Sequence, residues 1–364
     1  MKRDRAATCR AAALMLAAAL LPSTAAHAAA PVPPQAALVD SLIRPGENHF
    51  EHLWQLTFGG QNAEAYWSGD GTKLILQSTR DGWPCDQEFV FDLATGDVKR
   101  VSPGKGRTTC GYFFDHDRRI LFSSTHLAGD SCPPTPDYSK GYVWRVDPGY
   151  DIFTARPDGS DLTRLTNTPG YDAETTVSTD GKWFVFTSDR DGDLELYKMH
   201  PDGSGLVRLT HTPGYDGGAF FSRDGQWICY RASHPADSAA IADDHELLAR
   251  HLVRPTAMDL WVMKSDGSGQ HRITQLGGAS FAPYFTPDGK RIIFASNFEN
   301  SHGRNFDLYL VARDGGPTEA VTRDPTFDAF PMFSPESGRW LAFSSNRGGR
   351  IPGETNLFLA RWKP

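Results

Sequence analysis

The sequence lacks several patterns that would assign it a chemistry directly. No Gly-x-Ser-x-Gly nucleophile elbow is present, because the nearest match, Gly129–Pro133, breaks the pattern. No phosphate-binding loop and no Cys-x-x-Cys pair occur, and the 364 residues contain only 5 cysteines. These absences argue against an α/β-hydrolase, a P-loop protein and a cysteine-based zinc module.

Basic residues and long apolar runs are also scarce. Lys and Arg number 37 against 44 Asp and Glu, so the net charge is -7, which argues against nonspecific nucleic-acid binding. The one apolar run, Ala11–Leu21, is too short to span a bilayer and ends at Pro22. It follows a basic start and precedes the small residues Ala26–Ala28, so we predict a signal peptide over residues 1–28. We expect a periplasmic or secreted protein without a membrane span.

What the sequence does contain is a unit repeated six times. In the clearest copy, strands are expected at Arg164–Thr166, Trp183–Ser188 and Glu195–Met199. Turns are expected at Asp180–Gly181 and Asp202–Gly205. Four short strands per unit are typical of a propeller blade. We therefore predict an all-β, six-bladed β-propeller of four-stranded antiparallel blades over residues 52–364. The residue before the first turn of each unit marks the register: Ser68, Asp115, Ser178, Ser222, Thr286 and Ser334.

The two ends of the propeller are expected to meet. The sixth unit has a third strand at Asn356–Leu359 but no outer strand after it. Near the other end, His52–Thr57 has the outer-strand pattern, yet no blade precedes it. We predict that this segment completes blade six, which leaves no open sheet edge. Residues 29–51 are interpreted as a Pro-rich N-terminal segment outside the propeller.

Two insertions interrupt the regular spacing of the repeats. The first, His126–Gly149, lies in blade two and is rich in Pro, Asp and aromatic residues. The second, Ser233–Met258, lies in blade four and combines a possible N-cap, Asp237, with spaced apolar residues. It predicts a short helix over the channel mouth or an adjoining blade. Both insertions are expected on one loop-rich face.

Three cysteines are also expected on that face. Cys85, Cys110 and Cys132 fall in loops that open on the same side of a propeller, and an oxidising compartment favours a disulfide among them. We predict the pair Cys110–Cys132, with Cys85–Cys110 as the alternative. Cys229 lies within an apolar strand and is expected to be a small buried side chain.

The repeats resemble the TolB-like propeller repeat, a relative of the WD repeat. Four stretches are similar to a secreted subgroup of TolB-related proteins, and TolB itself carries an α/β domain ahead of its propeller. Only Pro31–Pro45 would lie between the leader and the first strand here, so the resemblance implies a propeller without that domain. The repeat match covers residues 52–362, and the four stretches are Gly106–Cys110, Gly141–Trp144, Gly170–Glu174 and Gly214–Phe221.

Charged residues near the entrances of the inner strands form the candidate ligand site. Several carboxylates could converge around the axis and favour a cation, a basic peptide or sugar hydroxyls. The alternative is that nearby arginines neutralise these acids in salt bridges between blades. The predicted ligand-binding residues are Glu64, Arg107, His126, Asp172, Glu174, Arg190, Asp216, Arg231 and Asp328.

Two classes of function fit these observations. The first is a noncatalytic, monomeric binding scaffold that holds an envelope protein, a peptide or a carbohydrate on its loop-rich face. The second is a polysaccharide-active lyase or hydrolase that uses carboxylates at the channel mouth. Because no motif ties an acid–base set together, we favour the first class and expect no catalytic residue, metal or cofactor.

Overall fold

The inner hairpin of a blade is fixed by its Asp-Gly turn. We describe a computed structural model over residues 31–139, 141–335 and 338–364. In the first blade the Ser68 hydroxyl donates to Asp70 and accepts from the Lys73 amide at 2.9 Å. Gly71 follows at φ 70°, in the left-handed region that favours glycine. Ser178 and Asp180 repeat the hydroxyl–carboxylate contact at 2.8 Å in the third blade.

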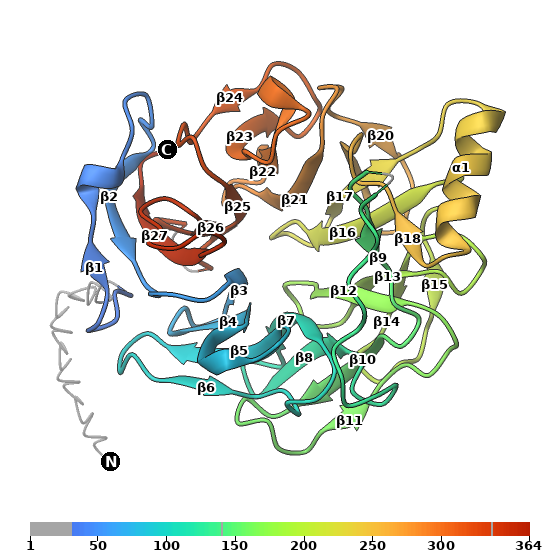
Figure 1. Cartoon of the computed structure of the whole chain (residues 1–364), viewed down its shortest axis with the longest axis horizontal. Helices are drawn as coiled ribbons and strands as arrows, with labels where there is room; N and C mark the ends of the chain where they lie inside the picture. The colour runs from blue at the N-terminus through green and yellow to red at the C-terminus, as the bar shows by residue number, and fades with distance from the viewer. Residues whose placement is uncertain (1–30, 140, 336–337) are drawn as a thin grey trace, which may run out of the picture. The chain divides into compact units, whose positions relative to one another are not determined.

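Six antiparallel sheets follow one another around a central axis (Figure 1). This confirms the predicted six-bladed propeller of four-stranded blades. The second strands predicted to be covered on both faces are buried, as Phe184–Phe186 illustrates with no exposed surface. Blade one comprises β3(Asn62–Trp67), β4(Lys73–Ser78), β5(Gln87–Asp92) and β6(Val98–Arg100), and blade two comprises β7(Thr108–Phe114), β8(Arg119–Ser124), β10(Asp151–Ala155) and β11(Thr163–Arg164). Blade three comprises β12(Asp172–Val177), β13(Phe184–Ser188), β14(Glu195–Met199) and β15(Val207–Arg208), and blade four comprises β16(Tyr215–Phe221), β17(Trp227–Ser233), β19(Asp259–Lys264) and β20(His271–Arg272). Blade five comprises β21(Ser280–Phe285), β22(Arg291–Ser296), β23(Asp307–Ala312) and β24(Glu319–Ala320).

Blade six is assembled from distant parts of the sequence. Strand β2(Phe50–Gln55) pairs antiparallel with β27(Asn356–Trp362), with Trp54 opposite Leu359, which confirms the predicted closure. The inner strands are β25(Asp328–Phe333) and β26(Trp340–Ser345). A further short strand, β1(Ala37–Leu38), pairs with β2 and makes this sheet five-stranded. The segment interpreted as lying outside the propeller therefore contributes a strand to it.

The residues between β1 and β2 are anchored by a buried ion triad. The 3-10 helix η1(Asp40–Leu42) leads to Glu47, whose carboxylate accepts from Arg347 at 3.0 Å. Arg347 also donates to Asp328 at 2.7 Å, and all three side chains have no exposed surface. Because each buried charge has an opposite partner, the triad ties the N-terminal segment to the inner strand of blade six.

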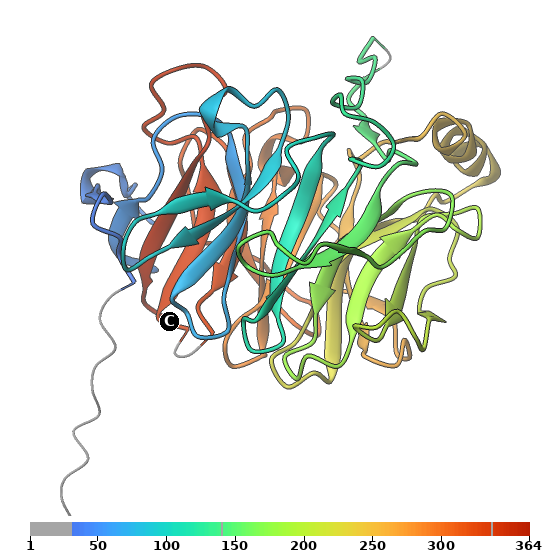
Figure 2. The same ribbon diagram turned by 90° about the horizontal axis from the view of Figure 1, so that it is seen from below.

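The two insertions meet and form a strap above the loop-rich face. Strand β9(Trp144–Arg145) from blade two pairs antiparallel with β18(Leu252–Val253) from blade four. Figure 2 shows the blade-two insertion projecting from that face of the propeller. Helix α1(Ser238–Leu248) confirms the predicted helix, and the Asp237 carboxylate caps the amides of its first turn. It lies at the outer edge of the propeller beside β18, away from the axis (Figure 1).

The remaining regular elements are two short 3-10 helices in loops, η2(Arg80–Gly82) and η3(Phe298–Asn300). No helix within the described ranges is long and apolar enough to cross a bilayer. The predicted signal peptide lies outside the described residues. The apolar core fills the spaces between neighbouring blades, so the loops and the axis are where charged side chains gather.

Candidate functional site

Each inner strand carries a β-bulge at the same place. The register shifts once in every pairing of an innermost strand with its neighbour, for example between Ala63 and Tyr66. One residue of each bulge adopts a left-handed conformation, with φ between 50° and 58°. This conformation costs on the order of 1–3 kcal/mol for a residue other than glycine. The six bulge residues are Glu64, Cys110, Glu174, Gly218, Ala282 and Phe330.

An aromatic layer closes the channel next to these bulges. Tyr66 of blade one contacts Phe220 of blade four across the axis, with ring centroids 5.6 Å apart. Tyr112 of blade two lies beside Tyr66, with ring centroids 5.5 Å apart, and near Tyr284 of blade five across the axis. Phe220 and Tyr284 are 5.5 Å apart and edge to face, so the layer is continuous. The cavities described below on the two faces share no lining residue, and this layer lies between them.

The cavity on the loop-rich face is a cup of about 1170 Å³. Glu64, Cys110 and Glu174 lie at its floor, beside the aromatic layer, and the strap supplies Trp144 near its mouth. We call this cavity the upper cup. Aromatic side chains dominate its walls, and they are Tyr138, Tyr142, Trp144, Tyr150, Tyr171, Tyr215, Phe281, Phe306, Phe327 and Phe330.

The mouth of the upper cup is bridged from three blades. Tyr138 and Tyr142 of the blade-two insertion stack with centroids 5.8 Å apart, and each is about half exposed. The guanidinium of Arg304, from blade five, lies 5.3 Å from the Tyr142 ring. Trp144 meets Phe281 edge to face and covers the guanidinium of Arg231 at 5.1 Å. The strap thus reaches over the cup to the opposite side.

Glu174 is held by four donors at the floor of the cup. Arg231 pairs with it, and the Tyr215 hydroxyl donates to it at 2.9 Å. The Thr187 hydroxyl and the Gly218 amide also donate to Oε2, at 2.7 and 3.0 Å. Burial opposes the charge on Arg231, but the neighbouring Glu174 and Tyr215 raise its pKa well above its usual range. The pair joins blades three and four.

Glu64 has a different environment from Glu174. It is partly buried, its carboxylate accepts from the Tyr66 hydroxyl at 3.1 Å, and the Cys110 thiol lies near it. Burial and the charge on Glu174 raise the pKa of Glu64 to about 7, although the nearby Arg231 opposes the shift. An acid with such a pKa near neutrality exchanges its proton at physiological pH.

The predicted aspartates lie in buried pairs at the starts of inner strands. Each is at most 1 % exposed and contacts a basic residue that follows the second strand of the same blade. They are not among the described residues that line the upper cup. The pairs are Asp172 with Arg190 at 2.7 Å, Asp216 with His234 at 3.0 Å, and Asp328 with Arg347 at 2.7 Å.

Of the remaining two predicted residues, Arg107 lines the upper cup and His126 does not. Arg107 lines the upper cup and lies 3.6 Å from the Asp86 carboxylate. His126 packs on Phe153 with centroids 4.4 Å apart, and its Nδ1 contacts the Ser124 hydroxyl at 2.9 Å. Burial, with help from nearby cations, lowers the pKa of His126. Of the nine predicted residues, the structure brings Glu64, Arg107, Glu174 and Arg231 into one cavity.

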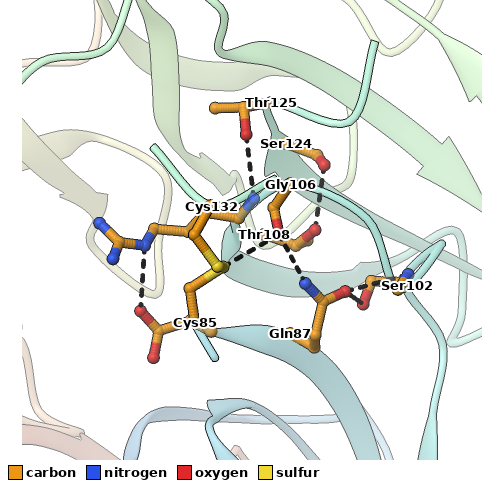
Figure 3. The surroundings of a disulfide bond; sticks show 11 residues. Cys85, Gln87, Ser102, Gly106, Thr108, Ser124, Thr125 and Cys132 are labelled. Atoms are coloured by element: carbon orange, nitrogen blue, oxygen red, sulfur yellow. Dashed lines mark hydrogen bonds and ion pairs between the residues drawn. A yellow bond between two sulfur atoms is a disulfide. The ribbon is translucent and has the colours of Figure 1, made fainter. Parts of the chain in front are cut away.

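The disulfide differs from the predicted pairing. Cys85 is bonded to Cys132, with Cα atoms 5.9 Å apart, so both Cys110–Cys132 and Cys85–Cys110 are wrong (Figure 3). Cys110 is free instead; it is the bulge residue of β7 and lines the cup. The loop that carries Cys132 is held to Gly106, whose amide donates to the Asp130 carbonyl at 3.0 Å. The Gly106 carbonyl accepts from the Gln87 side chain at 2.9 Å (Figure 3). Cys229 is free and buried, as predicted.

The opposite face carries a second cavity of about 1090 Å³. It is lined by the Asp-Gly turns and by the other side of the aromatic layer. Its loops cap one another, since Asp117 accepts from the amides of Gly69 and Asp70 at 2.7 and 2.9 Å. Across residues 31–139, 141–335 and 338–364, no three His, Cys, Asp or Glu side chains are grouped so that they could hold a metal ion.

Comparison with known proteins identifies the fold. No family model matches the chain. A protein assigned as TolB from Agrobacterium tumefaciens is 21% identical with a TM-score of 0.53, over 84% of this chain and 91% of that one. TolB from Acinetobacter baumannii is 18% identical with a TM-score of 0.55, over 80% of this chain and 64% of that one. Oligogalacturonate lyase from Vibrio parahaemolyticus is 12% identical with a TM-score of 0.51, over 91% of this chain and 97% of that one. The chain therefore shares the TolB-like propeller fold.

Proposed function

We propose that this protein is an exported, noncatalytic binding scaffold that receives a segment of an envelope protein in its upper cup. The observation that carries the proposal is a cavity closed at its floor by the Tyr66–Phe220 layer and open at its mouth. A cavity that ends inside the protein can admit a side chain or a chain end and bury it on all sides. Its volume of about 1170 Å³ is large enough for several residues of a peptide.

The lining of the cup supports a peptide ligand. Tyr and Trp side chains contribute most of the energy at protein interfaces, and Tyr138, Tyr142 and Trp144 stand at the mouth. They are carried by the blade-two insertion, which the Cys85–Cys132 disulfide ties to blade one and the β9–β18 pairing ties to the blade-four insertion. A rigid scaffold that presents exposed aromatic residues loses little conformational entropy when it binds a partner.

The proposed location is the periplasm. The predicted leader and the disulfide Cys85–Cys132 support an oxidising, extracytoplasmic compartment. The TolB-like fold of the chain agrees with an envelope role without specifying a partner.

The test is capture of a partner by a cup variant and its matched control. The double variant Tyr138→Ala/Tyr142→Ala removes two half-exposed rings, so its melting temperature should stay within about 2 °C of the wild type. His116→Ala changes an exposed residue that lines the opposite cavity and is the control. We expect the wild type and the control to retain one periplasmic protein and the double variant to lose it. Equal retention by all three would contradict binding through the cup.

A polysaccharide-active enzyme is the alternative. It is favoured by the arginines that line the cup, among them Arg107 and Arg304, because guanidinium groups bind uronic-acid carboxylates. It is also favoured by Glu64, whose pKa of about 7 suits a general base. A lyase leaves an unsaturated sugar that absorbs ultraviolet light. Growth of this absorbance when purified protein meets uronic-acid polymers, and its loss in Glu64→Gln, would replace the scaffold proposal with this one.

A further inference from the structure

The floor of the upper cup holds more negative than positive charge. Two carboxylates, Glu64 and Glu174, and one guanidinium, Arg231, lie within electrostatic reach of one another. Of the other four arginines that line the cup, three pair with acids, and the fourth, Arg304, lies over the Tyr142 ring at the mouth. Arg107 lies 3.6 Å from Asp86, and Arg254 lies 3.7 Å from Asp243. The floor is therefore one positive charge short of balance when Glu64 is ionised.

The excess belongs to Glu64 rather than to Glu174. Arg231 is committed to Glu174, and its Nη2 also donates to the Tyr215 hydroxyl at 2.6 Å. Among the residues that the structure describes, Glu64 accepts a hydrogen bond only from the neutral Tyr66 hydroxyl, and no salt bridge joins it to any of them. A partly buried carboxylate without a cation is costly, and the protein also holds it at φ 51°.

Every titratable group that faces Glu64 is either neutral or already engaged. Cys110 on β7 keeps its proton because burial raises the pKa of its thiol, and the same is true of Tyr66 on β3. Glu88 on β5 is buried without exposed surface, and burial with the charge of Glu64 raises its pKa well above the usual range. When Glu64 loses its proton, none of these groups neutralises the carboxylate, and a bound cation would do so.

The aromatic lining of the upper cup suits an organic cation. Tyr150 and Tyr171 meet edge to face at 5.7 Å and both line the cup. Trp144 already covers the guanidinium of Arg231, which shows that the strap can place an aromatic face over a cation. Aromatic faces attract ammonium and guanidinium groups most strongly when water is excluded. A small inorganic ion would leave these rings unused.

We infer that Glu64 anchors a basic group of the bound peptide, the ammonium of a lysine or the guanidinium of an arginine, beneath the tyrosine walls of the upper cup. This inference rests on the proposed function, because it names what enters the cup. The basic side chain would extend from the strap to the floor and would form an ion pair with the Glu64 carboxylate.

Binding is then coupled to release of a proton. The free Glu64 has a pKa of about 7, so at pH 6 most molecules carry a neutral acid. A bound cation favours the ionised form and lowers this pKa. Affinity should therefore rise about tenfold between pH 6 and pH 8 and level off above that range.

The test uses a probe of defined charge. N-acetyl-tetralysine amide and the same peptide with all four side chains acetylated are titrated calorimetrically at constant ionic strength. Capping both ends leaves the lysine ammonium groups as the only charges. The variant Glu64→Gln keeps the size of the side chain and an acceptor for Tyr66, and Glu51→Gln, an exposed acid on β2, is the matched control.

We expect the basic peptide to bind the wild type and Glu51→Gln equally, and to bind Glu64→Gln at least tenfold more weakly with no dependence on pH. Equal affinity for Glu64→Gln would overturn the inference, because the peptide would then bind elsewhere. Equal affinity for the acetylated peptide would also overturn it while leaving a cup that binds neutral chains. If neither peptide binds, the basic anchor is wrong, and capture with the Tyr138→Ala/Tyr142→Ala variant decides separately whether the cup binds a partner.

Discussion

At the scale of single residues, the six bulges of the inner strands, which we call the bulge ring, turn side chains in directions that a regular strand does not allow. Only one of its six positions is glycine, although the left-handed conformation favours glycine throughout. At Glu64 and Glu174 the protein bears that cost and gains two carboxylates that face the axis. At Glu174 the strain is offset by four hydrogen-bond donors, some of which come from the neighbouring blade, whereas Glu64 makes no comparable contacts. This difference between two equivalent positions is the reason for proposing Glu64 as the ligand-binding one.

Glu64 should therefore reduce stability when it is ionised. Its pKa in the folded protein, about 7, lies above the ordinary 4.5, so the unfolded chain loses the proton first as pH rises. Stability falls between pH 4.5 and 7 and the penalty is complete above pH 7. Glu64→Gln should raise the free energy of unfolding at pH 8 by about 3 kcal/mol and leave it unchanged at pH 4. Urea denaturation at both pH values measures this, and a loss of stability at pH 8 would show that the carboxylate is structural.

The sequence identified some of these residues and not others. Glu64, Glu174 and Arg231 were predicted because they stand near the entrances of inner strands. The bulge ring was not predicted, because Glu, Cys, Gly, Ala and Phe at equivalent positions share no pattern. The aspartates Asp172 and Asp216 were grouped with the acids of the site, but they pair with Arg190 and His234 inside their own blades. Sequence position alone does not say whether an acid at a strand entrance points to the axis or into its sheet.

At the scale of elements, the strap is held by one disulfide and one short pairing. Cys85–Cys132 connects the insertion of blade two to a loop of blade one, and β9–β18 connects it to blade four. The disulfide was mispaired in the prediction because three cysteines on one face can be joined in several ways. The β9–β18 pairing was missed because each strand has two residues and leaves no local signal.

Removing the disulfide should destabilise the protein. The bond joins residues that are 47 apart in sequence, and it lowers the conformational entropy of the unfolded chain. This loss stabilises the folded state by about 3 to 4 kcal/mol. We expect Cys132→Ser to lower the free energy of unfolding by roughly this amount under oxidising conditions. Cys110→Ser removes the free thiol of the cup and is the control. If Cys110→Ser is the damaging variant, the assigned pairing is incorrect.

At the scale of the whole molecule, closure depends on a contact that is distant in sequence. The pairing of β2 with β27 was predictable because His52–Thr57 has the pattern of an outer strand and the last unit needs one. The triad of Glu47, Arg347 and Asp328 was not predicted, since residues 29–51 were interpreted only as Pro-rich. It lies where the N-terminal segment meets the inner strand of blade six, with no exposed side-chain surface.

Breaking the triad should open the ring. Arg347→Met leaves Glu47 and Asp328 buried without a cation, at an expected cost of about 3 to 5 kcal/mol in the free energy of unfolding. The deficit should be larger at pH 8 than at pH 5, because burial raises the pKa of Asp328 and its protonation relieves the deficit at the lower pH. Arg361→Met, at a partly exposed pair with Glu51, should cost less than about 1 kcal/mol. Comparable effects of the two substitutions would contradict the closure assigned to the triad.

The most direct measurement is an NMR titration of the Glu64 side-chain carboxyl carbon, with and without N-acetyl-tetralysine amide. For the free protein we predict a pKa of about 7, and for the complex a pKa lowered by the bound ammonium group. A free pKa near the ordinary 4.5, or one that the peptide leaves unchanged, would contradict a cationic ligand at the floor of the upper cup.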